Sequence, residues 1–313
     1  MRHPPYHLRV NKAIDRFLLV EILDILKKYC DISDYTYYGF GGPFLEDCRL
    51  INNRYPEINI VSIEKSEQTF KRQQFHQFSK NLELRCEDFT SFLANFPSTS
   101  TGREIFWLDY TDLKFGHFDD FMSILGKVSE KSIVKITIRA APDEKIEVWE
   151  EFQQKYDKIL PASAKKTDIE RLLPFTKLLQ GMIHIASQQA LPASGESIFQ
   201  LLNSSHYSDQ THMLSITGIV CNKNEVSEIQ QWFKNWHFVN LKWNDPRRID
   251  VPILSTKERL HLEKYLPTKA KTGRFLSRAL GYKIDNSQNE HIEKLKQYEE
   301  FYQYYPYFAR VSI

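Results

Sequence analysis

The chain has 313 residues, of which 42% are apolar and 26% are charged, with a formal net charge of +2. This length exceeds the usual size of one compact domain, so we expect one large domain with an appendage. The cysteines are scattered without a C-x-x-C pair, which argues against a disulfide framework and against a zinc site. The N-terminal residues lack the apolar core of a signal peptide, and no apolar run approaches the roughly 18 residues that span a bilayer. These features predict a soluble protein in a reduced, cytoplasmic setting, with no membrane partner and no bound metal.

The first 140 residues alternate between helical and extended patterns. Apolar residues recur at helical spacing over 13–29, so a helix is expected before the first strand. Strands rich in apolar, β-branched and aromatic residues are then predicted at 35–40, 58–63, 82–88, 104–110 and 132–140. Helical runs separate them at 43–55, 66–78, 89–96 and 118–128. Strands and helices that alternate in this way predict an α/β fold with a parallel sheet covered on both faces.

The pattern changes after residue 140. Residues 141–210 are expected to form a mainly helical insertion. Two more strands are expected at 212–220 and 237–244, with a helix between them. From Pro246 onwards there is no strand signal, and helices are expected at 256–266, 272–281 and 289–304. The sequence therefore predicts a domain over 1–245 and a basic helical extension over 246–313 that packs on it.

A glycine-rich turn follows the first predicted strand, and an acid ends the second. Gly39, Gly41 and Gly42 surround Phe40 in this turn, and the second strand ends on Glu64. In nucleotide-binding sheets, glycines let the backbone approach a ligand, and an acid about 20 residues later accepts hydrogen bonds from ribose hydroxyls. A plain tight turn is the alternative interpretation. A dinucleotide-binding dehydrogenase would need G-x-G-x-x-G spacing, which this stretch lacks.

This order of strands, glycine turn and terminal acids resembles the class I S-adenosylmethionine-dependent methyltransferases, although the turn FGGPF differs from that family's acid followed by G-x-G-x-G. The resemblance implies a Rossmann-like, mostly parallel sheet of seven strands and S-adenosylmethionine as the cofactor. It places Glu64 on the ribose, Asp88 (or Glu87) near the adenine amine, and Asp109 beside the reacting centre. The implied cofactor-binding residues are Gly39, Phe40, Gly41, Gly42, Glu64, Lys65, Asp88 and Asp109.

Lys135 lies within the apolar run of the fifth predicted strand, where an unpaired ammonium would be costly. Ribose 2′-O-methyltransferases carry a lysine in a similar context, with a lysine on the leading helix and an aspartate after the fourth strand. This resemblance implies a catalytic triad of Lys12, Asp109 and Lys135. The glutamate that completes that family's set is missing, since its place reads Thr211. A lysine whose ammonium reaches solvent at the sheet edge is the alternative. The next candidates to pair with Asp109 are Asn11 and Arg139.

Basic residues gather between 242 and 283, where they include Arg247, Arg248, Lys257, Arg259, Lys264, Lys269, Lys271, Arg274 and Arg278. Such an excess suits a polyanion, so RNA or DNA is the predicted partner of this region, and a solvated helix surface is the alternative. We therefore predict an S-adenosylmethionine-dependent methyltransferase that acts on a hydroxyl of a nucleic acid, with RNA favoured. The alternatives are a non-catalytic module that binds a nucleotide or a partner protein, and a small-molecule O-methyltransferase.

Overall fold

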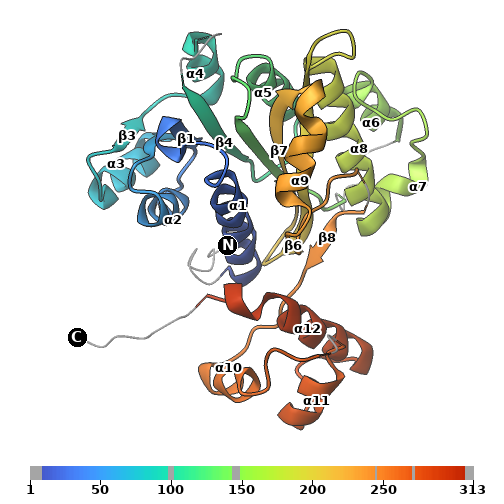
Figure 1. Cartoon of the computed structure of the whole chain (residues 1–313). Helices are drawn as coiled ribbons and strands as arrows, with labels where there is room; N and C mark the ends of the chain where they lie inside the picture. Colours follow the sequence, from blue (N-terminus) through green and yellow to red (C-terminus); the bar gives the residue numbers. More distant parts are fainter. Residues whose placement is uncertain (1–8, 98–101, 143–148, 244, 270–271, 307–313) are drawn as a thin grey trace. The chain divides into compact units, whose positions relative to one another are not determined.

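The computed structural model describes residues 9–97, 102–142, 149–243, 245–269 and 272–306 (Figure 1). The chain forms two compact units. The larger one, called the sheet unit, consists of Leu19–His206 and Thr211–Arg247. The smaller one, called the helical unit, takes the chain up to Leu18, Tyr207–Gln210 and the chain from Arg248 onwards. Helix α1 (Val10–Leu26) contributes residues to both units.

An eight-stranded sheet runs in the order β3-β2-β1-β4-β5-β7-β6-β8. The pairs β3-β2, β2-β1, β1-β4 and β4-β5 are parallel, and β7 pairs antiparallel with β5. The strands are β1 (Tyr35–Gly39), β2 (Asn59–Ile63), β3 (Leu82–Arg85), β4 (Arg103–Asp109), β5 (Ile133–Arg139), β6 (Ser197–Ser208), β7 (His212–Asn222) and β8 (Arg247–Ile249). The predicted Rossmann-like, mostly parallel fold is confirmed, with eight strands in place of the expected seven.

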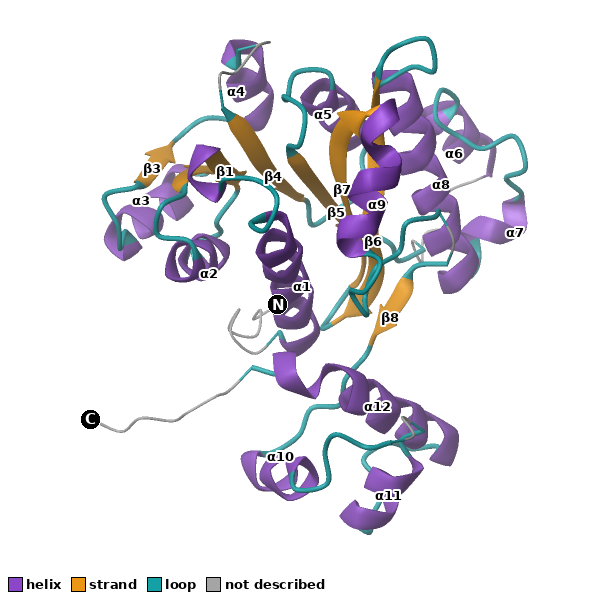
Figure 2. Cartoon of the chain, viewed as in Figure 1, coloured by secondary structure: helices purple, strands orange, loops and turns teal. Residues whose placement is uncertain are grey.

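Helices cover both faces of this sheet, as the alternation of purple and orange elements in Figure 2 shows. Successive residues of a strand point to opposite faces, so each strand contributes to two cores. On β4, Ile105 and Trp107 join the core built with α1, α2 (Glu46–Arg54) and α9 (Val226–Phe233). Phe106 and Leu108 join the core on the other face, built with α4 (Phe89–Asn95), α5 (Phe115–Leu125), α6 (Trp149–Tyr156) and α8 (Leu172–Ala190). Because both faces are buried, these strands read as continuous apolar runs.

The end of the segment predicted to be mainly helical is a strand with buried polar residues. The insertion expected to be mainly helical over 141–210 contains α6, α7 (Lys166–Ile169) and α8, but it ends in the twelve-residue strand β6. Polar side chains on β6 are buried and hydrogen-bonded: Ser204 donates to Gln180 on α8, and the Asn203 amide donates to the Phe238 carbonyl at 2.8 Å. Such residues hide a strand from a search for apolar runs.

Two further strand predictions were wrong. The strand expected at 237–244 is absent from the described residues of that range, which form turns and irregular segments. Its backbone makes one ladder-like bond, from the Asn240 N–H to the Leu202 carbonyl at 2.8 Å. The short strand β8 instead follows Pro246, where no strand was expected, because three residues are too few to carry a pattern.

The three helices expected after residue 246 are present in the helical unit, and each buries apolar side chains, among them Leu262, Leu276 and Leu295. The helices are α10 (Thr256–Glu263), α11 (Arg274–Leu280) and α12 (Gln288–Phe301). The carboxylate of Asp209 accepts the Asn11 and Lys12 backbone N–H groups, both at 2.9 Å, and so caps the first turn of α1. The Asn11 side chain donates to the Ser208 carbonyl and accepts the Val251 N–H, both at 2.9 Å. Hydrogen bonds therefore tie the start of α1 to segments that are distant in sequence.

Candidate functional site

A cavity of about 390 Å³ lies in the sheet unit, where parallel strands end. Phe40 follows β1, Glu64 and Lys65 follow β2, Asp88 follows β3, and Asp109 is the last residue of β4. The carboxyl ends of parallel strands are the usual ligand sites of open α/β sheets. The structure thus brings five of the sequence-predicted residues into one cavity wall.

Two side chains that the sequence analysis did not identify form hydrogen bonds to the backbone of the glycine turn between β1 and α2. The Gln73 amide on α3 (Glu67–His76) donates to the Phe40 and Gly42 carbonyls, both at 3.0 Å. Ser62 of β2 donates to the Phe40 carbonyl at 3.4 Å. Gly41 and Gly42 have φ angles of +64° and +55°, a region that residues with a Cβ rarely occupy. Phe40 lines the cavity, and the glycines shape the turn that carries it.

The two predicted cofactor acids are both engaged at helix starts. The Glu64 carboxylate accepts the Ser66 N–H at 2.7 Å while lining the cavity. Asp88 caps α4 by accepting the backbone N–H of Ser91 at 2.9 Å and its hydroxyl at 2.6 Å. These hydrogen bonds lower the pKa of Asp88, so its carboxylate is ionised at neutral pH. Glu87 lines the same cavity, so either acid after β3 can contribute to it.

A polar cluster after β4 forms the next part of the wall, and the sequence analysis did not assign it a role. The Tyr110 ring stacks on the His117 ring with centroids 3.7 Å apart, and the Tyr110 hydroxyl donates to the Asp120 carboxylate at 2.6 Å. His117 Nε2 lies 2.6 Å from the Asp112 carboxylate, which also pairs with Lys114 at 2.5 Å. The signal was present, since the stretch from Tyr110 to Asp120 follows a buried strand and carries several acids and a histidine.

Burial and neighbouring charges set the ionisation of this cluster. Burial lowers the pKa of His117 although Asp112 favours its charged form, so the imidazole is neutral at pH 7. Burial would raise the pKa of Asp112, but hydrogen bonds from Lys114 and His117 outweigh burial and lower it. Burial raises the pKa of Asp120. The cluster thus holds a neutral imidazole beside an ionised carboxylate.

The cavity as a whole is acidic. Its lining includes two lysines, Lys65 and Lys114, against six carboxyl groups, which belong to Glu64, Glu87, Asp88, Asp109, Asp112 and Asp120. A cleft lined by one sign of charge concentrates ligands of the opposite sign. Phe40, Phe89 and Tyr110 form an aromatic group on the same wall, with Phe40 centred 5.4 Å from Phe89 and 5.3 Å from Tyr110. The cavity therefore suits a cationic ligand with a flat ring.

The three predicted catalytic residues, Lys12, Asp109 and Lys135, lie in different elements of the fold. Lys135 is 1% exposed in the central strand β5, so the interpretation of an ammonium that reaches solvent at the sheet edge is wrong. Its Nζ lies 4.3 Å from the centroid of the Trp107 ring, and such a cation–π contact offsets part of the cost of burial. In the ladder Lys135 pairs with Trp107 and Asp109 pairs with Thr137. Lys12 is a buried residue of the helical unit. The triad of Lys12, Asp109 and Lys135 stays a prediction.

Two absences concern the described residues only. They contain no group of three or more His, Cys, Asp or Glu side chains that could hold a metal ion. Within the same part of the chain, no helix is both long and apolar enough to cross a membrane.

Comparison with known proteins found one family and several distant structures. Residues 4–313 match the family described as "Putative O-methyltransferase". A search of curated proteins found no match. Trm1 from Pyrococcus horikoshii with S-adenosyl-L-methionine is 12% identical, with 71% of this chain and 59% of that chain covered and a TM-score of 0.46. LepI in complex with the same compound is 12% identical, with 63% and 46% covered and a TM-score of 0.37. A putative O-methyltransferase from Klebsiella pneumoniae is 9% identical, with 70% and 83% covered and a TM-score of 0.40. The chain spans less than two thirds of the length of Trm1 and of LepI.

Proposed function

The chain belongs to the family described as "Putative O-methyltransferase", and on that premise we propose that it transfers a methyl group from S-adenosylmethionine to a hydroxyl of a nucleic acid, with RNA favoured. Membership confirms the predicted class, the S-adenosylmethionine-dependent methyltransferases, and with it the predicted cofactor. The observation that carries the proposal is the acidic, aromatic-walled cavity at the carboxyl ends of β1, β2 and β4. We also propose a cytoplasmic location. All four cysteines are free, which fits a reducing compartment.

The residues around the cavity fit this cofactor chemically. S-adenosylmethionine carries a sulfonium and an ammonium, so an excess of carboxylates attracts it and would repel the pyrophosphate of a dinucleotide. Glu64 would accept hydrogen bonds from the ribose hydroxyls, and the rings of Phe40 and Phe89 would contact the adenine. When bound, the cofactor supplies an electrophilic methyl group, and its transfer leaves a neutral thioether.

The acceptor hydroxyl must lose a proton, and the cavity wall contains groups that can receive it. If the His117 proton resides on Nε2 and is donated to Asp112, Nδ1 is left as an acceptor in a neutral ring. Asp109, at the end of β4, is the other candidate. Of the predicted triad, Lys135 lies in the same unit as Asp109, and its ammonium would orient the hydroxyl and stabilise the developing oxyanion.

The nucleic-acid part of the proposal is supported by the surface of the helical unit. Between 250 and 283, the exposed charged side chains of the described residues are all cations, namely Lys257, Lys264, Lys269, Arg274, Arg278 and Lys283. Tyr265 and Phe275 are 41% and 44% exposed in the same region, with ring centroids 5.5 Å apart, and exposed rings can stack on bases. Three other basic residues make internal contacts: Arg247 with Phe238, Arg248 with Asp250, and the buried Arg259 with Glu263. Lys271 lies outside the described residues.

Calorimetry with S-adenosylmethionine and NAD⁺ tests the cofactor assignment. The protein should bind S-adenosylmethionine and not NAD⁺, and Glu64→Ala should weaken binding at least about tenfold, since charge-assisted hydrogen bonds contribute roughly 1.5–3 kcal/mol each. Glu67→Ala is the matched control, because Glu67 is an exposed glutamate on α3 whose partner is Lys71 at 2.8 Å. If Glu64→Ala binds S-adenosylmethionine as tightly as the unmodified protein does, Glu64 does not hold the ribose. If the unmodified protein does not bind S-adenosylmethionine, the cofactor assignment is refuted.

Transfer of a labelled methyl group to RNA and DNA pools tests the acceptor. Label recovered on ribose hydroxyls after digestion to nucleosides is the expected result. Label found only on low-molecular-weight compounds would refute a nucleic-acid acceptor and leave the methyltransferase assignment intact.

A further inference from the structure

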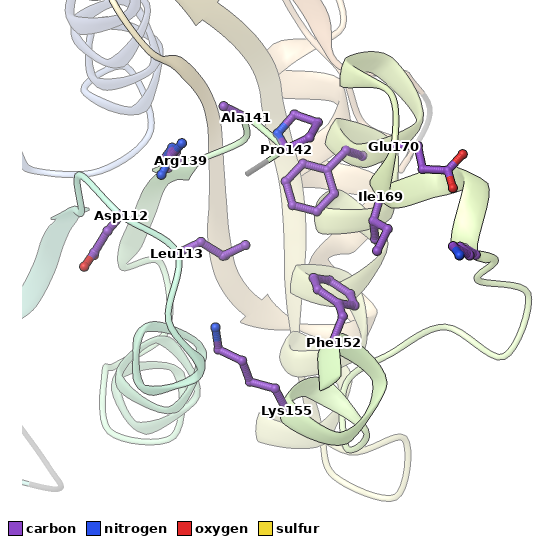
Figure 3. Close-up of a pocket in the computed structure, with 11 residues that line it drawn as sticks. Asp112, Leu113, Arg139, Ala141, Pro142, Phe152, Lys155, Ile169 and Glu170 are labelled. Carbon is purple, nitrogen blue, oxygen red and sulfur yellow. The ribbon is translucent and has the colours of Figure 1, made fainter. Parts of the chain in front are cut away.

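A second cavity, of about 440 Å³, opens next to the first within the sheet unit. Asp112 lines both cavities, so they meet at the loop after β4. The Arg139 N–H donates to the Asp112 carbonyl at 3.3 Å, which ties the end of β5 to this loop. The remaining lining residues come from the loop after β5, from α6, from α7 and the residue after it, and from α8. Figure 3 labels several of them, including Pro142, Phe152 and Ile169. A ligand in this second cavity would therefore lie beside the site proposed for the cofactor.

Part of the lining of the second cavity is apolar. Leu113, Phe152, Ile169 and Phe175 line it. The Phe152 and Phe175 rings have centroids 6.1 Å apart and an interplanar angle of 63°. In Figure 3 the Phe152 and Leu113 side chains border the same open space. Aromatic and aliphatic walls of this kind favour a planar, apolar group.

Three basic residues also line the same cavity. Arg139, Lys155 and Lys166 line it, against the acids Asp112 and Glu170. The Asp112 carboxylate already forms an ion pair with Lys114, so part of its charge is compensated before a ligand arrives. The Lys155 and Lys166 side chains are exposed and come from α6 and α7, two different helices. This charge pattern is opposite to that of the first cavity and favours an anion.

We propose that the second cavity is the acceptor site and that it binds a planar ring carrying an anionic group, with the reacting hydroxyl directed towards Asp112. This inference rests on the proposed function, because it takes the first cavity as the cofactor site. The volume is in the range of small-molecule sites, roughly 300–1,000 Å³, and fits one nucleotide-sized group but not a double helix. The same chemistry can come from a single nucleotide of an RNA strand or from a free aromatic acid or nucleotide.

Binding measurements with two matched double variants test the site. Uridine 5′-monophosphate, 4-hydroxybenzoate and a single-stranded RNA decamer are titrated calorimetrically into the full-length protein, with and without S-adenosylhomocysteine. We expect at least one probe to bind, and the double variant Lys155→Gln/Lys166→Gln to bind it about tenfold more weakly, since two charge-assisted contacts are lost. The matched control is Lys158→Gln/Lys234→Gln, which removes the same charge from exposed positions of the sheet unit and should change the affinity less than about twofold.

Selective loss of affinity in the Lys155/Lys166 variant supports the acceptor site, and the probe that shows it identifies the source as RNA or as a free molecule. The proposal is overturned if none of the probes binds in either state, or if both double variants bind them alike. Affinity for S-adenosylhomocysteine is measured in the same samples and should be equal in all variants. If S-adenosylhomocysteine does not bind to the unmodified protein, the proposed cofactor site is refuted. The second cavity is still tested in that case, by the titrations made without S-adenosylhomocysteine.

Discussion

Replacing Gly41 by alanine should destabilise the protein more than the same change at its neighbour Gly42. Both residues have positive φ angles, so a Cβ at either position costs about 1–2 kcal/mol in the left-handed region. At Gly41 the new Cβ would also lie 2.5 Å from the Ser62 hydroxyl and 2.9 Å from a Leu45 methyl group, and both side chains are fully buried. At Gly42 it would meet no atom within 4 Å.

The steric term sets the expected difference between the two variants. Overpacking of a buried site costs roughly 1–3 kcal/mol, while the loss of chain entropy in the unfolded state returns about 0.4–1 kcal/mol in both variants. We therefore expect Gly42→Ala to lower the free energy of unfolding by about 1 kcal/mol, and Gly41→Ala by about 2–4 kcal/mol.

Urea unfolding followed by circular dichroism measures both values. The Gly41 variant should also bind S-adenosylmethionine more weakly, because the turn carries Phe40 into the cavity wall. Equal stability losses in the two variants, or a larger loss for Gly42→Ala, would show that the contacts of Gly41 with Ser62 and Leu45 do not limit the turn.

Lys135→Met removes the ammonium and keeps a side chain of similar length. It should slow methyl transfer about 100-fold or more while the affinity for the cofactor changes little. Transfer at the original rate would show that Lys135 has only a structural role. For His291, burial lowers the pKa from 6.5, and its Nδ1 accepts the Ile284 N–H at 3.2 Å. As the pH falls, the unfolded state therefore takes up the proton first, so the contribution of neutral His291 to the free energy of unfolding is fully present above about pH 6.5 and is lost as the pH falls below it. His291→Gln should flatten this pH dependence of the free energy of unfolding, and an unchanged slope would contradict the assignment. Arg274→Ala/Arg278→Ala should reduce the slope of log K for RNA against log salt by about 1.4, at roughly 0.7 per phosphate contact, whereas an unchanged slope would favour a simple solvated surface.

The sequence alone was sufficient for the parallel half of the sheet and for one wall of the candidate site. Strands buried on both faces read as apolar runs, and the acids at their ends are local features, so the residue pattern places Glu64, Asp88 and Asp109 at one edge of the sheet. The glycine turn was recognisable for the same reason, because a positive φ angle constrains the residue type at that position. Hydrogen bonds and burial far from these positions were not needed to predict them.

Tertiary structure decided whatever depends on partners distant in the chain. The strand β6 is stable because Ser204 and Asn203 find partners on α8 and at residue 238, and its own sequence does not reveal those partners. Lys135 tolerates burial beside the Trp107 ring of a neighbouring strand. The second cavity is lined by residues from the loop after β4, from β5 and from three helices, and local periodicity carries no information about how such segments meet. Elements and strand-end acids are encoded locally, whereas strand pairing, compensation of buried polar groups and cavity shape arise from contacts that form only when the whole sheet has assembled.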